Sequence, residues 1–170
     1  MILRGLLISL LLVTAVVLET ALFPSVTLLG FRPDLLLLLV LAIAVHDGPM
    51  SGARVGAVAG LLADLLIMQS PVGLSVAIYA TLGWLIGVLR PYVAPDSISG
   101  PVVLAFVSGV LGTAAYGTIT WLLADQRATF DLVFQAALAV GLYNTLLAPL
   151  AYALVGRLGA RFPMRGQPAE

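Results

Sequence analysis

The sequence predicts an all-α protein that crosses a membrane several times. Of its 170 residues, 61% are hydrophobic and 9% are charged, and the mean hydropathy is +1.13. A soluble domain carries about 25% charged residues, so most of this protein's surface must face lipid. The apolar residues also form runs long enough for membrane helices, separated by short polar or proline-containing breaks. We therefore expect a polytopic bundle of six transmembrane helices.

The same composition excludes several kinds of site. All eight basic residues are arginines, and they lie at run boundaries and near the C-terminus, so they form no basic face for nucleic acid. The chain has no cysteine, which excludes disulfides and thiolate chemistry. Its lone histidine, His46, falls in a predicted turn, so one chain cannot form a multi-histidine metal site. We expect no catalytic residues, no cofactor and no metal, since neither a phosphate-binding loop nor a serine-protease pair is present.

The first predicted helix covers residues 2–23 and contains two charged residues, Arg4 and Glu19. Its length matches a membrane crossing and exceeds the apolar core of a signal peptide, so we expect a retained helix that Pro24 ends. Glu19 lies near the end of this helix. Its carboxylate either reaches the interface or pairs with Arg32 or with a partner protein.

The second predicted helix starts at Pro33 and runs to Val45. Proline suits the first helical position, and Asp34 in the first turn would face the positive end of the helix dipole. With about 1.5 Å per residue this helix spans about 20 Å, against a hydrocarbon core of about 30 Å. It must be thin, re-entrant or extended upstream. Because residues 35–45 contain no polar side chain, its surface could face lipid almost all round.

The third predicted helix follows a polar break at residues 46–52 and carries a glycine series. Gly52, Gly56 and Gly60 recur at every fourth residue and therefore share one helix face. Glycine at this spacing lets another helix approach closely. That helix belongs either to this chain or to a partner protein.

Asp64 continues the glycine series and is expected to point into the bundle. A central aspartate costs about 2.5–3.5 kcal/mol on insertion scales, which indicates a transport site or a packing hydrogen bond. For the second interpretation, the candidate partners are Tyr79, Asn144 or a backbone carbonyl group.

Three further helices are predicted after the turn at Ser70–Pro71. They cover residues 72–89, 101–124 and 132–155. In the last, Pro149 leaves the carbonyl of Thr145 without its usual donor, so we expect a kink. Because the connecting loops are short, residues 1–162 should form one transmembrane domain, and residues 163–170 a disordered tail.

The arginines predict the orientation of the chain. Six crossings place both termini on one side of the membrane. With the termini in the cytoplasm, six arginines lie inside and two, Arg32 and Arg127, lie outside. The positive-inside rule therefore favours cytoplasmic termini.

Several blocks of this sequence resemble the family of rod-shape-determining MreD proteins. The first block is Arg32-Pro33-Asp34-Leu35-Leu36-Leu37-Leu38-Leu39, and a second runs from Gly56 to Leu66. Further matches are Gly48, Gly52, Gly73, Tyr79, Gly83, Gly87, Tyr143-Asn144-Thr145 and Pro149.

The resemblance implies a non-enzymatic scaffold in the inner membrane of bacteria, within the machinery for cell elongation and peptidoglycan synthesis. It implies an MreC-like single-span partner, and direct or indirect association with RodA, a class B penicillin-binding protein and MreB, besides membrane lipid. A helix of the partner would dock on an apolar or glycine-lined groove.

The implied fold is similar to that of the substrate-binding subunits of energy-coupling-factor transporters. The alternative function is therefore that of a vitamin-capturing transporter subunit. The Ala-xxx-Ala docking motif of those subunits is missing from the first helix, which counts against this alternative.

Overall fold

The computed structural model describes residues 2–21, 30–66, 72–92, 99–123 and 129–161, and apart from short connections such as residues 30–34 these ranges are helical. This confirms the all-α prediction. The helices are α1 (Ile2–Ala21), α2 (Leu35–Asp47), α3 (Pro49–Leu66), α4 (Leu74–Leu89), the short 3-10 helix η1 (Arg90–Tyr92), α5 (Ser99–Leu122) and α6 (Phe130–Arg161).

Four helices in the described part of the chain are long and apolar enough to cross a membrane, and they confirm a multi-pass membrane protein. These are α1, α4 together with η1, α5 and α6. The helix α2 is apolar but has only 13 residues. The helix α3 has 18 residues, and its glycines, Arg54 and Asp64 lower its hydropathy. Crossing by all six helices remains a prediction.

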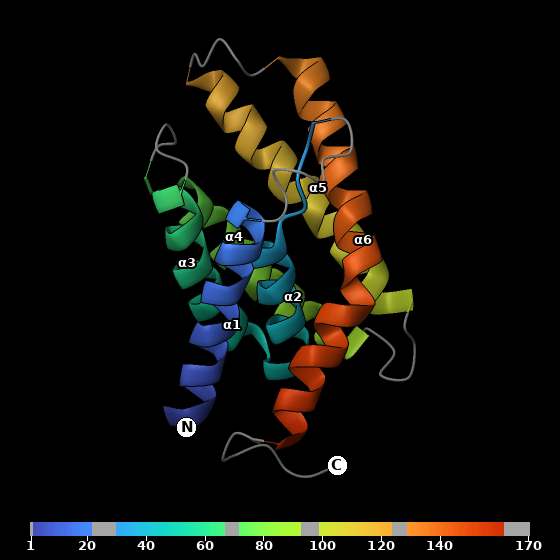
Figure 1. Ribbon diagram of the computed structural model, residues 1–170. Coiled ribbons are helices and arrows are strands. Elements are labelled where there is room, and N and C mark those ends of the chain that lie inside the picture. Colours follow the sequence, from blue (N-terminus) through green and yellow to red (C-terminus); the bar gives the residue numbers. More distant parts are fainter. Residues whose placement is uncertain (1, 22–29, 67–71, 93–98, 124–128, 162–170) are drawn as a thin grey trace.

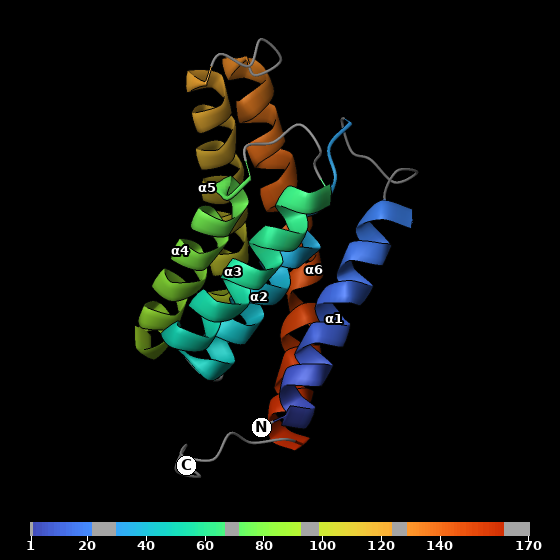
Figure 2. The same cartoon turned by 90° about the vertical axis from the view of Figure 1, so that its left-hand side faces the viewer.

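The helices alternate in direction, as Figures 1 and 2 show. The start of α1 and the end of α6 lie at the same end of the bundle, which we call the terminal end. At the other end, which we call the distal end, α5 and α6 extend past α1–α4 in both views. Beyond the starts of α2 and α4, only α5 and α6 therefore continue toward the distal end.

The centre of the bundle is α2, which contacts every other α-helix. All nine residues from Leu36 to Ala44 are buried. The expectation that this helix faces lipid was wrong, because a helix that is apolar all round can be covered by protein as well as by lipid. Five neighbouring helices supply that cover, so a helix too short to cross a membrane unaided is enclosed by longer ones.

The helix α6 is longer than expected and continues through Pro149. Its axis changes direction along its length in Figure 1, as a proline inside a helix favours. Three sequence predictions lie outside the described residues: the stop at Pro24, the turn at Ser70–Pro71 and the tail at residues 163–170.

Candidate functional site

Acidic residues of three helices gather at the distal end of the bundle. Glu19 lies in the last turn of α1, Asp34 immediately precedes α2, and Asp64 lies in the last turn of α3. Each carboxylate accepts hydrogen bonds from the backbone at the start of a helix. We call Glu19, Asp34, Asp64 and the hydroxyl of Tyr79 the capping cluster.

Glu19 connects α1 to the start of α2. Its Oε1 accepts hydrogen bonds from the backbone N–H groups of Leu35 at 2.5 Å and Leu36 at 3.1 Å. The first N–H groups of a helix have no partner within the helix, and in a bilayer each unsatisfied group costs several kcal/mol. The structure therefore directs this carboxylate to α2, and not to Arg32, whose side chain is exposed.

Asp34 completes the cap of α2. Its Oδ1 accepts a hydrogen bond from the backbone N–H of Leu37 at 2.8 Å, and its carbonyl oxygen accepts one from Leu38 at 3.1 Å. Together with Glu19 it satisfies the first four N–H groups of α2. Asp34 is thus the N-cap residue, and Pro33, which was expected at the first helical position, lies buried just before it.

Tyr79 ties α4 to this cap. Its hydroxyl donates a hydrogen bond to Oδ2 of Asp34, with 2.6 Å between the two oxygens. Each oxygen of the Asp34 carboxylate therefore has a donor, one from the backbone of α2 and one from a side chain of α4. This bond spans 45 positions in sequence, and no short-range motif indicates it.

Asp64 performs the same capping role for α4. Its Oδ2 accepts a hydrogen bond from the backbone N–H of Gly73 at 2.7 Å, and its Oδ1 accepts one from Ser75 at 3.1 Å. Gly73 has a φ of 103°, a conformation that glycine adopts readily. The Asp64 side chain points into the bundle, as expected, and only 2% of the residue is exposed. Its partners are backbone donors of the next helix, which differ from the three candidates that the sequence indicated.

The glycine series of α3 packs directly against α4. A Cβ atom added to Gly52, Gly56 or Gly60 would lie closer than 3.0 Å to backbone atoms of α4. The residues that supply these atoms are Gly83, Tyr79 and Ser75. Because α4 already occupies this face, the close approach that the glycine spacing predicts takes place within the chain.

A buried ion pair lies near the terminal end, and sequence reasoning did not identify it. The guanidinium of Arg4 in α1 contacts Oδ1 of Asp47 at the end of α2. Side-chain exposure is 10% for Arg4 and 4% for Asp47. One available signal was a single arginine inside an otherwise apolar run, since such a charge requires a partner in a membrane.

Asn144 lies inside the bundle on α6 and is fully buried. Neither atom of its amide has a hydrogen-bond partner among the described residues, and the same holds for the buried hydroxyl of Ser108 on α5. The amide lies beside Gly109, whose added Cβ would be 3.2 Å from Nδ2. Pro149, one turn further along α6, is exposed.

The described residues contain no group of three histidine, aspartate or glutamate side chains that could hold a metal ion. The geometry instead assigns backbone capping to the carboxylates of the capping cluster. Comparison with curated proteins and with solved structures gave no match. The model of the family described as rod shape-determining protein MreD matches residues 1–111. The chain therefore belongs to the rod shape-determining protein MreD family.

Proposed function

We propose that this protein is a non-enzymatic scaffold of the cell-elongation and peptidoglycan-synthesis machinery in the bacterial inner membrane. It would bind an MreC-like single-span protein and, directly or through it, RodA, a class B penicillin-binding protein and MreB. Membership of the MreD family supports a role in cell shape. The proposal further treats residues 1–162 as one domain.

The capping cluster is the observation that carries this proposal. A carboxylate that moves an ion or a proton must exchange partners, whereas Glu19, Asp34 and Asp64 each accept hydrogen bonds from backbone N–H groups of a helix start. These bonds fix α1 to α2 and α3 to α4 in a bilayer, where few other donors are available. The result is a rigid surface, which suits a platform for assembly.

The charges of the described residues support cytoplasmic termini. One aspartate and five arginines belong to the terminal end: Asp47, Arg4, Arg54, Arg90, Arg157 and Arg161. The distal end has one arginine and four acidic residues: Arg32, Glu19, Asp34, Asp64 and Asp131. Under the positive-inside rule the terminal end faces the cytoplasm.

The partner helix would dock on a surface other than the glycine face of α3, because α4 covers that face. The outer side of α1 is one such surface. Its exposed large side chains follow one face of the helix: Leu3, Leu6, Leu10, Val13 and Val17. The extended parts of α5 and α6 offer further exposed apolar residues, including Trp121 and Phe134.

Co-expression with the MreC-like protein of the same organism tests the proposal. We expect the two proteins to purify together in detergent. Stoichiometric capture of a vitamin without any MreC-like partner would refute the scaffold and favour the transporter subunit.

A cross-linking scan locates the surface in the same complex. A photo-reactive residue is introduced at exposed positions of α1, α5 and α6, for example Val13, Trp121 and Leu146, with buried Leu41 as the matched control. We expect cross-links to the partner from one continuous face. Cross-links spread evenly over all exposed positions would contradict a defined docking surface.

A further inference from the structure

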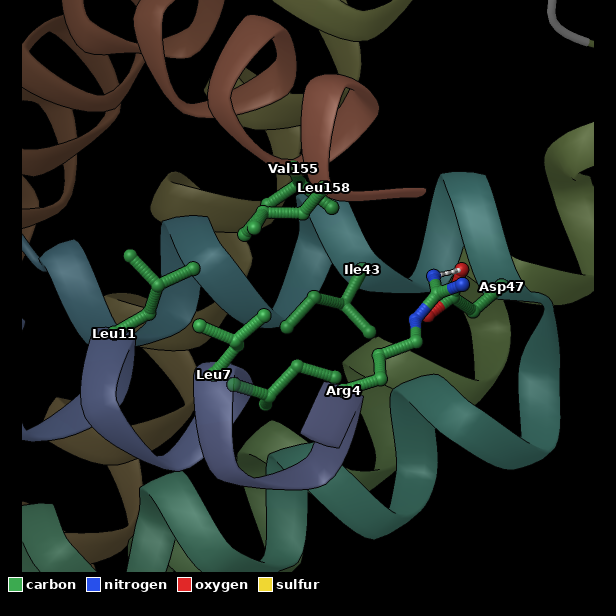
Figure 3. A pocket seen from close by; sticks show the side chains of 8 residues that line it. Arg4, Leu7, Leu11, Ile43, Asp47, Val155 and Leu158 are labelled. Atoms are coloured by element: carbon green, nitrogen blue, oxygen red, sulfur yellow. Dashed lines mark hydrogen bonds and ion pairs between the residues drawn. The ribbon is translucent and has the colours of Figure 1, made fainter. Parts of the chain in front are cut away.

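Two layers of polar contacts connect α1 to α2, one toward each end of these helices. Near the terminal end, the side chain of Arg4 reaches across to Asp47, as Figure 3 shows. At the distal end, Glu19 accepts a hydrogen bond from the backbone of Leu35. The rise from Arg4 to Glu19 along α1 is about 22 Å. The rise from Leu35 to Asp47 along α2 is about 18 Å. The apolar interval between the two layers is therefore about 20 Å, well short of a hydrocarbon core of about 30 Å.

The outward surfaces of α1 and α3 have a similarly short apolar height. On α1, the exposed large apolar side chains run from Leu3 to Val17, a rise of about 21 Å. On α3, beyond the exposed Arg54, they run from Val58 to Leu66, a rise of about 12 Å. Neither surface would cover a hydrocarbon core of ordinary thickness.

The outward surfaces of α5 and α6 are taller. Exposed large apolar side chains of α5 run from Val103 to Leu122, a rise of about 28 Å. Those of α6 run from Phe134 to Leu154, a rise of about 30 Å. Both values match an ordinary hydrocarbon core, so the two sides of the bundle differ in the membrane thickness that they fit.

The contact between α2 and α6 places the two sides at a common level near the terminal end. A Cβ atom added to Gly156 of α6 would lie 3.0 Å from Nε2 of His46 in α2. From this level α2 rises about 17 Å to its start at Leu35, whereas α6 rises about 39 Å to its start at Phe130. The difference in height is therefore at the distal end, where α5 and α6 extend past the other helices in Figures 1 and 2.

The polar groups at the distal ends of α1 and α2 are fixed at their level. Glu19 and Asp34 are held by hydrogen bonds to backbone N–H groups of α2, so these carboxylates cannot extend toward a more distant membrane surface. Arg32, just before Asp34, is exposed, and a charged side chain in the membrane needs water or a headgroup nearby. The lipid headgroups must therefore approach the capping cluster.

We propose that the side formed by α1 and α3 binds a locally thinned bilayer, with the lipid headgroups of the distal leaflet at the level of the capping cluster. The side formed by α5 and α6 contacts a bilayer of ordinary thickness. A bilayer thins around a protein surface that is shorter than its hydrocarbon core. Short or disordered acyl chains fit such a surface best. This lipid interaction goes beyond the scaffold function and requires no protein partner.

Fluorescence quenching by lipid-attached nitroxides tests this proposal. The full chain, which has no cysteine of its own, carries one bimane-labelled cysteine in vesicles of dioleoylphosphatidylcholine. The nitroxide is attached either to the headgroup or to the middle of the acyl chain. The matched positions are V17C on α1 and L142C on α6, which are both exposed. Val17 lies about 20 Å along the helix from Arg4, and Leu142 about 21 Å from Gly156.

We expect the headgroup nitroxide to quench V17C severalfold more than the chain nitroxide does, and the reverse at L142C. A flat bilayer of about 30 Å would instead place both labels in the acyl-chain region. L65C, at the exposed distal turn of α3, should behave like V17C and replaces it if V17C does not fold. Thermal unfolding of each labelled variant verifies folding.

Two positions nearer the terminal end serve as controls. Leu10 on α1 and Leu150 on α6 are both exposed, and each lies about 9 Å along its helix from the same terminal level, marked by Arg4 and Gly156. At L10C and L150C the chain nitroxide should be the stronger quencher on both sides of the protein. This result shows that labels on the two sides report depth in the same way.

Stronger quenching by the chain nitroxide at either V17C or L65C would overturn the proposal, because the bilayer would then keep its ordinary thickness beside α1 and α3. Stronger quenching by the headgroup nitroxide at both V17C and L142C would also overturn it, because the two sides would not differ. The result is independent of partner binding, because no MreC-like protein is present in the vesicles.

Discussion

At the residue scale, three buried or half-buried carboxylates explain how short helices begin inside a bilayer. Glu19 serves two N–H groups of α2, Asp34 serves a third and also Tyr79, and Asp64 serves two N–H groups at the start of α4. A carboxylate at a helix N-terminus also interacts favourably with the positive end of the helix dipole. The hydrogen bonds to the backbone therefore offset the cost of placing each acidic residue in the membrane, because the N–H groups at these helix starts need an acceptor.

Replacement of Glu19 by alanine tests this explanation. It leaves the N–H groups of Leu35 and Leu36 without their acceptor, so we expect a loss of about 1–3 kcal/mol in the free energy of unfolding. E19Q, which keeps an acceptor oxygen, should lose less. Thermal unfolding in detergent measures the stability of E19A and E19Q against the unaltered protein.

The matched control is T20A. Thr20 is exposed, and its hydroxyl bonds to backbone carbonyls of its own helix, so this variant should unfold like the unaltered protein. If E19A were no less stable than T20A, the capping role of Glu19 would be wrong.

The partners of these residues could be predicted from the sequence only in part. That Asp64 points inward followed from the helical spacing of Gly52, Gly56 and Gly60. Its donors did not follow, because they lie 9 and 11 positions away on the next helix. Glu19 and Leu35 are 16 positions apart, and their contact depends on how α1 packs against α2, which no local pattern specifies.

At the element scale, the pair formed by α3 and α4 and the burial of α2 define the bundle. The spacing of the glycines predicted a close helix contact, and the structure adds that α4 makes it. The burial of α2 could not be predicted from composition, because an apolar helix satisfies lipid and protein surroundings equally well. Only the contacts of α2 with the other five α-helices show that it is covered by protein and not by lipid.

The α3–α4 contact should tolerate no side chain at its glycines. G56A places a Cβ against the backbone of Tyr79 and Ala80, and backbone atoms cannot move aside as a side chain can. We expect a loss of about 1–3 kcal/mol in stability, and a larger loss for G56L. Detergent-solubilised yield and unfolding temperature report the effect.

Gly5 provides the control for this experiment. It lies in α1 with nothing within 4 Å of an added Cβ. G5A should therefore be neutral or stabilising, because alanine favours a helix over glycine by about 1 kcal/mol. If G56A proved as stable as G5A, the close contact between α3 and α4 would not govern stability at Gly56.

At the scale of the whole molecule, the charged residues that the structure describes divide between the two ends of the bundle, with most arginines at one end and most acidic residues at the other. The terminal end is rich in arginine, and the distal end holds the capping cluster. The distribution of arginine in the sequence had already favoured cytoplasmic termini. The structure adds the acidic distal end and the longer α5 and α6 beside it (Figure 2).

Labelling of single cysteines tests the orientation cleanly, because the chain has no cysteine of its own. Met50 at the start of α3 is 59% exposed, and Phe130 at the start of α6 is 81% exposed. In cells with a permeabilised outer membrane, a membrane-impermeant maleimide should label F130C and leave M50C unlabelled. Labelling of M50C alone would show that the orientation is the reverse of the one proposed.

The most direct test of the account compares D64N with D64A in cells that depend on this protein for rod shape. Asparagine cannot carry a charge and keeps only one acceptor oxygen, so it can serve the N–H of Gly73 or of Ser75 but not both, whereas alanine removes both acceptors. If the carboxylate only holds α4, both variants lose rod shape in proportion to their loss of folded protein, and D64N, which keeps one of the two hydrogen bonds, loses less than D64A. A D64N protein that folds, inserts and binds its partner normally, yet leaves the cells round, would contradict the structural role of the capping cluster.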